Sequence, residues 1–234
     1  MNHRKRYGQH FLKSINIAKF IVDSTNLTKN DVVYEIGTGR GILIPLLCKK
    51  SKHVISSEKD TLLYDDAVSK FSDFKNLTLV KGDGFQEKRK FDIFVSNLPY
   101  SQSKIAIHWM IMQEFPLAVI MVQSDFAEKL LGKNQKRKSI SVLAQTCFDM
   151  KILRKIQKEN FSPPPKINSV IMMFSRKSTI SKELIQSVNL LFSFRRKKIQ
   201  NIAKQLGLEI KSDMRLEDMS NNEIIKLAEK IKRI

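Results

Sequence analysis

The sequence has few of the residues on which disulfide-bonded and metal-dependent proteins rely. Its 234 residues include two cysteines, Cys48 and Cys147, which lie far apart in apolar segments. Their separation matches neither disulfide nor zinc-site spacing, so both are expected to be small core residues in a reducing cytoplasm. The four histidines are scattered along the chain, and the sequence therefore predicts no metal site.

Long uncharged apolar runs are also missing, and acidic residues are in the minority. Without such a run or an amphipathic anchor, the sequence gives no support for a membrane protein. The basic segment Met1–Arg6 is not followed by an apolar stretch, so no secretory signal is expected and the predicted location is the cytoplasm. The 42 Lys and Arg residues against 23 Asp and Glu residues give a formal net charge of +19. This excess predicts a polyanionic partner, RNA or DNA.

Strand-like apolar runs alternate with amphipathic segments in the first part of the chain, which is typical of an α/β fold around a mainly parallel sheet. The predicted strands are 31–36, 53–57, 77–81, 91–95, 117–122, 151–156 and 168–174. The predicted helices are 15–25, 42–48, 104–114 and 140–148, and then 184–194, 198–206 and 221–231. Because only helices are expected after about Lys177, we predict one domain over residues 1–176 and a small helical domain over 177–234.

A glycine-rich turn follows the first predicted strand and precedes a helix. Gly37, Gly39 and Gly41 stand at this junction, where glycines let a ligand approach the backbone and let the helix pack closely, as in nucleotide sites of doubly wound folds. The spacing is G-x-G-x-G and not the G-x-G-x-x-G of dinucleotide enzymes, so it favours an adenosyl cofactor.

Acidic residues stand at the ends of the next two strands. Glu58 follows the second strand, roughly twenty residues after the glycines, the usual place for a carboxylate that accepts ribose hydroxyls. Asp83 follows the third strand and is predicted to accept the cofactor's adenine amine. Strand ends that carry matching polar groups at regular intervals predict one site at the carboxyl edge of the sheet.

The segment Asn97–Tyr100, with the sequence NLPY, follows the fourth strand and suggests methylation of an aromatic amine in adenine or cytosine. The lone pair of such an amine is delocalised into the ring, so an enzyme must favour the pyramidal nitrogen. The Asn97 side-chain oxygen and the Leu98 carbonyl can each accept one of its N–H groups. Pro99 stiffens the backbone so that this carbonyl faces the site, and Tyr100 is predicted to stack on the base.

A stiff loop, residues 160–166, carries three consecutive prolines beside Phe161. An exposed Phe161 would be held out by this loop and would stack on the base opposite Tyr100. Two aromatic rings around an extruded base are a common arrangement in enzymes that act on nucleobases.

Basic residues cluster in three runs that are predicted to contact RNA phosphates without selecting a sequence. The RNA-contacting residues are expected to be Arg4, Lys5, Arg6, Lys136, Arg137, Lys138, Arg195, Arg196, Lys197 and Lys198.

Taken in order, these motifs resemble the small-subunit ribosomal RNA adenine N6-dimethyltransferases of the KsgA type. The resemblance also includes Gly8–Leu12, FSPPPK with Asn168–Ser169, and Phe194–Lys197. It implies a seven-stranded class I (Rossmann-like) methyltransferase fold, S-adenosylmethionine as methyl donor, and two adjacent adenines near the 3′ end of small-subunit rRNA as substrate. The cofactor residues that it implies are Gln9, His10, Leu12, Glu35, Gly37, Gly39, Glu58, Asp83 and Asn97. The base-handling residues that it implies are Asn97, Leu98, Pro99, Tyr100 and Phe161.

Three alternatives share this fold. The first is the related large-subunit rRNA adenine methyltransferase family that confers macrolide resistance, whose members tend to have Ile at the position of Leu98 and to lack so full an FSPPPK segment. The others are a non-catalytic ribosome-assembly factor and a DNA amino-methyltransferase. The chain departs from the small-subunit family at Gln123–Asp125, where Gln-x-Glu is frequent, and in a short C-terminal part. A monomer is the expected state.

Overall fold

The computed structural model describes residues 9–87, 89–132 and 137–231, which form two compact units. The first unit comprises residues up to Ala106, Phe115–Ala127 and Met150–Arg176, and the second comprises Ile107–Glu114, Glu128–Asp149 and the residues from Lys177 onwards. The segment Glu128–Asp149 belongs to the second unit because its helix α6 (Ser139–Cys147) packs against the C-terminal helices α7 (Lys182–Ser193) and α9 (Asn221–Ile231). The division of the chain at Arg176 into two domains stays a prediction.

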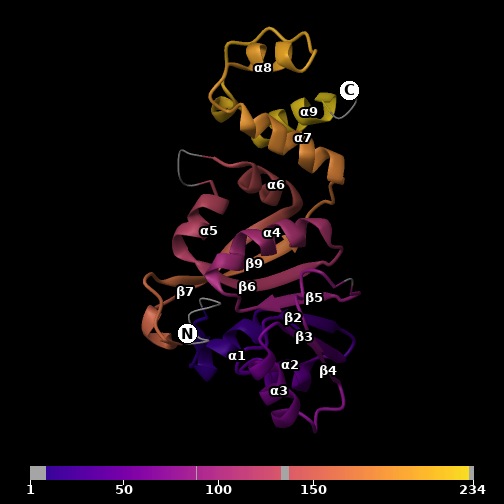
Figure 1. Ribbon diagram of the computed structural model, residues 1–234, viewed down its shortest axis with the longest axis vertical. Helices are drawn as coiled ribbons and strands as arrows, with labels where there is room; N and C mark the ends of the chain where they lie inside the picture. The colour runs from indigo at the N-terminus through magenta and orange to yellow at the C-terminus, as the bar shows by residue number, and fades with distance from the viewer. Residues whose placement is uncertain (1–8, 88, 133–136, 232–234) are drawn as a thin grey trace. The chain divides into compact units, whose positions relative to one another are not determined.

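A seven-stranded sheet, mainly parallel, forms the centre of the α/β part and confirms the predicted fold class. Its strands are β2 (Val32–Ile36), β3 (His53–Glu58), β4 (Leu77–Lys81), β5 (Ile93–Ser96), β6 (Leu117–Gln123), β7 (Phe148–Ile156) and β9 (Ser169–Arg176). Their order across the sheet is β4-β3-β2-β5-β6-β9-β7 (Figure 1). The pairs β3–β4, β2–β3, β2–β5 and β5–β6 are parallel, and β9 runs antiparallel to β6.

A second, two-stranded sheet pairs β1 (Phe11–Leu12) with β8 (Phe161–Ser162) in antiparallel register. Leu12 lies opposite Phe161, so the beginning of the described chain is joined to the proline-rich loop. The sequence did not predict this pair, because two residues are too few to display the alternation that marks a strand.

The remaining helices are α1 (Ile15–Asp23), α2 (Ile44–Lys50), α3 (Thr61–Lys70), α4 (Ser103–Met112), α5 (Ser124–Leu130) and α8 (Ile199–Gln205). Side-chain caps fix several starts: the Ser14 hydroxyl accepts the N–H of Ile17 at the start of α1, and Asp60 accepts the N–H groups of Leu62 and Leu63 at the start of α3. Helices α3 and α5 were not predicted. The only fully buried residue of α3 is Ala67, so its sequence lacks a clear apolar stripe.

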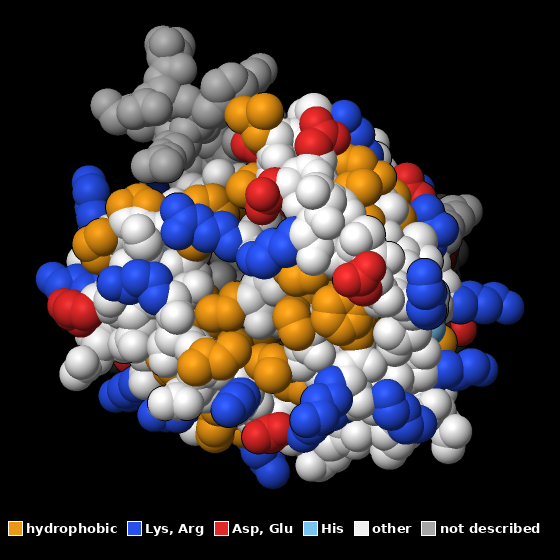
Figure 2. All heavy atoms as spheres, turned by 90° about the horizontal axis from the view of Figure 1, so that it is seen from below, with side chains coloured by type: hydrophobic (Ala, Val, Ile, Leu, Met, Phe, Trp, Pro, Cys, Tyr) orange, Lys and Arg blue, Asp and Glu red, His pale blue; other side chains and the backbone are white. Residues whose placement is uncertain are grey.

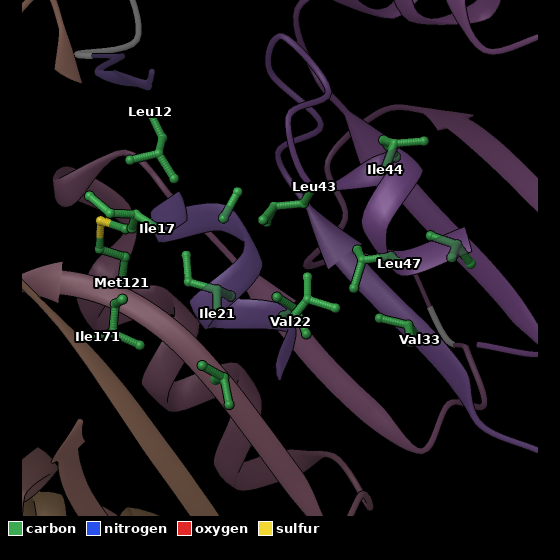
Figure 3. Packing of buried hydrophobic residues seen from close by; sticks show 14 of the residues in the cluster. Leu12, Ile17, Ile21, Val22, Val33, Leu43, Ile44, Leu47, Met121 and Ile171 are labelled. Atoms are coloured by element: carbon green, nitrogen blue, oxygen red, sulfur yellow. The ribbon is translucent and has the colours of Figure 1, made fainter. Parts of the chain in front are cut away.

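The core of the first unit lies between one face of the large sheet and helices α1 and α2 (Figure 3). Ile17, Ile21 and Val22 of α1 pack beside Leu47 of α2 and the strand residue Val33. Burial of these side chains removes apolar area from water and fixes the register of the strands. None of the helices in the described ranges is both long and apolar enough to span a bilayer.

Candidate active site at the ends of the central strands

The parallel pairing of β2 with β3 and β5 brings the predicted motifs to one edge of the sheet. Because Ile36, Glu58 and Ser96 end these strands, the residues that follow them are neighbours in space. They line a cavity of about 980 Å³, a volume that includes the space where it opens to solvent. Every residue predicted to bind the cofactor lines this cavity: Gln9, His10, Leu12, Glu35, Gly37, Gly39, Glu58, Asp83 and Asn97. Their role in binding stays a prediction.

Hydrogen bonds hold the glycine-rich turn against the end of β3. Gly37 donates its N–H to the carbonyl of Ser57 at 2.8 Å. Gly41 has a φ of +72°, and a Cβ atom added there would lie 2.2 Å from Cε2 of Phe71. Glycine is therefore needed at this position for both the backbone conformation and the space.

Glu58 links the glycine-rich turn to the start of α3. Its Oε2 accepts the N–H of Gly39 at 2.8 Å, and its Oε1 accepts the N–H of Asp60 at 2.9 Å. Burial raises the pKa of Glu58, and these backbone hydrogen bonds oppose the rise. Each carboxylate oxygen can accept a further hydrogen bond, so Glu58 can hold the turn and still receive a ligand hydroxyl.

Glu35, which lies in strand β2 just before the glycine-rich turn, takes part in a buried chain of hydrogen bonds. The Ser56 hydroxyl donates to Oε2 of Glu35 at 2.5 Å, and the hydroxyls of Thr38 and Ser56 are 2.6 Å apart. Burial raises the pKa of Glu35 to about 8, with a smaller contribution from the charge of Glu58 and an opposing one from the Ser56 hydrogen bond. The carboxyl group is therefore largely protonated at neutral pH.

Asp83 lies on another wall of the cavity and is oriented by two neighbours. Its Oδ2 forms an ion pair with Nζ of Lys59 at 3.0 Å, and its Oδ1 accepts the N–H of Phe85 at 3.2 Å. Lys59 also lines the cavity, although it was assigned no role from the sequence. In the sequence, the position of Lys59 directly after Glu58 was the one feature that could have predicted its place in the cavity.

The Asn97–Tyr100 loop leaves β5 and passes along the same cavity. Asn97, Leu98 and Pro99 line it, and Leu98 is 5% exposed. The Pro99 carbonyl accepts the N–H of Gln102 at 2.8 Å, which closes a short 3-10 turn over Tyr100–Gln102. The Tyr100 hydroxyl is hydrogen-bonded to the Ser169 hydroxyl of β9, and burial raises the pKa of Tyr100.

Residues 9–12 cover part of the cavity. The His10 ring stacks on Tyr100 with a centroid distance of 5.4 Å and an interplanar angle of 25°. The Arg40 guanidinium lies 4.7 Å from the centroid of the Phe11 ring. Phe11 and Arg40 both line the cavity, and neither was assigned a role from the sequence, although both stand inside the motifs that carried the resemblance.

Comparisons with known proteins agree with this arrangement. The sequence model of the family described as "Ribosomal RNA adenine dimethylase" matches residues 1–233. The chain is 33% identical to "Ribosomal RNA small subunit methyltransferase A" of Sulfurihydrogenibium sp., over 96% of this chain and 94% of that protein. The chain belongs to the ribosomal RNA adenine dimethylase family.

Solved structures have the same fold as this family member. A dimethyladenosine transferase from Plasmodium falciparum superposes with a TM-score of 0.82 at 22% identity, over 96% of this chain and 98% of that one. The 23S rRNA methyltransferase ErmE has a TM-score of 0.70 at 21% identity, over 94% and 99% of the two chains. The first superposition is the better one, although at these identities both show the fold alone.

Family membership makes the chain a methyltransferase whose methyl donor is S-adenosylmethionine. The cavity fits this donor by its chemistry. Two carboxylates, Glu58 and Asp83, provide acceptors for hydroxyl and amine hydrogens, and Gly37 and Gly39 leave the backbone accessible between them. Among the described residues, no group of three His, Cys, Asp or Glu side chains is arranged to hold a metal ion.

One predicted site residue of the dimethylase needs correction. Phe161 was expected to be exposed, but it is 1% exposed and lies in the core cluster with Leu12 and Ile17. Pairing of β8 with β1 turns its ring inward, where apolar burial is favourable. In this conformation the ring is not available to a base.

The predicted RNA-contacting residues of the dimethylase fall into three groups. Arg4–Arg6 and Lys136 lie outside the described residues. The Arg137 guanidinium donates to the Met219 carbonyl and to Oδ1 of Asn221, each at 2.7 Å, so this side chain connects the segment before α6 with α9. Lys138 and Arg195–Lys198 are exposed. Figure 2 shows one face of the molecule, on which Lys and Arg side chains outnumber acidic ones. Contact of these residues with RNA stays a prediction.

Proposed function

We propose that the chain transfers methyl groups to N6 of two adjacent adenosines near the 3′ end of small-subunit rRNA, on an assembling ribosomal subunit in the cytoplasm. The observation that carries the proposal is that Asn97 and Leu98 line the same cavity as the glycine-rich turn and Glu58. An amine held by the first pair would therefore lie close to a donor held by the second. The name of the Sulfurihydrogenibium relative, a small-subunit methyltransferase, supports the choice of substrate.

The residues of the loop have distinct tasks in this proposal. When bound, the donor supplies an electrophilic methyl group. The Asn97 side-chain oxygen and the Leu98 carbonyl accept the two N–H groups of the target amine, which favours the pyramidal nitrogen with its lone pair available. Pro99 has no N–H to compete for these acceptors. No strong base is required, because the nitrogen becomes acidic only after it has accepted the methyl group.

Large-subunit rRNA is the alternative substrate. Leu98, in place of the Ile frequent in that family, and the full FSPPPK segment favour the small subunit. The two substrates differ in where modified adenosines occur, so primer extension on rRNA treated with the enzyme separates them. Stops confined to large-subunit rRNA would overturn the proposed substrate.

Methyl incorporation tests the proposed chemistry. Immature small subunits are incubated with labelled S-adenosylmethionine and either the wild-type chain or Asn97→Ala. We expect at least a hundredfold lower rate for the variant, since misplacement of a reacting group costs about that factor. Asn30→Ala, an exposed turn residue, is the matched control and should label normally. Equal labelling by Asn97→Ala would remove Asn97 from its proposed role.

A further inference from the structure

The ring that is predicted to stack on the target base already has a partner within the chain. His10 and Tyr100 are stacked, with ring centroids 5.4 Å apart, a distance typical of offset aromatic pairs. His10 also lines the cavity that contains Asn97 and Leu98. Tyr100 itself is not among the residues that line the cavity, whereas the His10 ring stacked on it is.

Both rings are held in place by hydrogen bonds at their edges. The Tyr100 hydroxyl is bonded to the Ser169 hydroxyl of β9, which ties the ring to the central sheet. Nδ1 of His10 lies 2.8 Å from the Pro163 carbonyl. Because a carbonyl only accepts, Nδ1 carries the hydrogen in this arrangement.

We propose that His10 occupies the place of the target adenine on Tyr100, and that it must leave this face before the adenine can stack there. The proposal rests on the proposed function, since it requires an adenine as the incoming ring. Of the two rings, His10 is the one expected to move, because Tyr100 follows a central strand. The movement is expected to end before Leu12, because the Leu12 side chain is buried in the core at 4% exposure.

The stacked imidazole also lets the site favour an adenosine within RNA over a free adenine nucleotide. An incoming base must replace the His10 stack and the hydrogen bond to Pro163. An adenosine within RNA gains phosphate interactions elsewhere on the protein that offset this cost. A free adenine nucleotide lacks most of these interactions, so His10 disfavours its entry.

Nucleotide binding by the full chain tests this inference. The protein is saturated with S-adenosylhomocysteine, which fills the cofactor site, and is titrated with adenosine 5′-monophosphate by NMR. We expect His10→Ala to bind the nucleotide about tenfold more tightly than wild type, the scale of one stacked pair with one hydrogen bond. His10→Phe keeps a stacked ring and should gain at most about twofold. In a Tyr100→Ala background, His10→Ala should have no effect.

A second measurement uses the wild-type protein. The ring signals of His10, assigned by their loss in His10→Phe, should shift when the nucleotide binds, because the imidazole leaves the Tyr100 ring current. Unchanged signals, weaker nucleotide binding by His10→Ala, or an equal gain in the Tyr100→Ala background would each overturn the inference. Methylation of rRNA is scored separately. If the chain methylates no small-subunit rRNA while the nucleotide still displaces His10, the proposed function fails, and what stands is that an adenine ring replaces His10 on Tyr100.

Discussion

The carboxylate of Glu58 and the backbone N–H of Gly39 are joined by a hydrogen bond of 2.8 Å. The acidic residue predicted to receive the ribose is thus also the residue that holds the glycine-rich turn. Loss of this side chain removes a ligand acceptor and releases the turn at the same time. Both losses act on the cofactor site.

We expect Glu58→Ala to weaken S-adenosylmethionine binding by about 1–3 kcal/mol, the range for a lost hydrogen-bond partner of a charged group. Isothermal titration calorimetry measures the change. Asp73→Ala, which alters an exposed acidic residue outside the cavity, is the control and should bind normally. Unchanged affinity in Glu58→Ala would exclude Glu58 from its predicted role in cofactor binding.

Stability should fall as the pH rises through the window set by Glu35. Its pKa is about 8 in the folded protein against 4.5 for the unperturbed group, so the folded state keeps a proton that the unfolded state has released. The contribution of this proton to the free energy of unfolding is complete below pH 4.5 and is lost by about pH 8. Over this range the free energy of unfolding falls by no more than about 1.4 kcal/mol per pH unit.

The variant Glu35→Gln has no proton to lose and should reduce this slope in urea unfolding between about pH 5.5 and 8. Part of the slope should remain in this variant, because burial also raises the pKa of Glu58. Glu159→Gln alters an exposed glutamate and should leave the slope as in wild type. An identical slope in Glu35→Gln would mean that Glu35 ionises normally in the folded protein.

Gly41→Ala should destabilise the first unit by about 2–5 kcal/mol, because a left-handed backbone and overpacking against Phe71 both add cost. Urea unfolding measures the loss. Gly207 also has a positive φ, +69°, but nothing lies within 4 Å of an added Cβ. Gly207→Ala should therefore cost only about 1–2 kcal/mol. Equal costs for the two variants would contradict the proposed clash.

Removal of the Arg195 and Arg196 charges should weaken the salt dependence of RNA binding. The slope of the logarithm of the binding constant against the logarithm of the salt concentration should become shallower by about 0.7–0.9 for each phosphate that is no longer neutralised. Lys198 forms an ion pair with Asp213 at 2.7 Å, so Lys198→Ala is expected to change the slope less. The measurement is the RNA dissociation constant at several salt concentrations, with S-adenosylmethionine affinity as the control for folding. An unchanged slope would place both arginines away from RNA.

The sequence predicted the central strands and the cavity well, because their signals are local. Each buried strand is a short apolar run, and Gly37, Glu58, Asp83 and Asn97 stand at or just beyond the ends of such runs. The order of parallel strands then brings these residues together without further information.

Features that depend on pairings between distant parts of the chain were missed. Phe161 has a partner in Leu12, and no local pattern connects the two. In the same way, Arg137 stands in a basic run typical of a solvated surface, while its hydrogen-bond partners, Met219 and Asn221, lie far along the chain. Such pairings follow from tertiary structure and leave no periodic trace in the sequence.

The pairing of β1 with β8 has a consequence for synthesis. Residues 9–12 are made early, yet the strand that receives them begins at Phe161, and His10 and Pro163 are 153 positions apart. Until Phe161 has been made, residues 9–12 lack the strand with which they pair, and Leu12 lacks its partner in that strand. The wall of the cavity that residues 9–12 form is therefore paired with its neighbouring strand only after Phe161 and Ser162 have been made.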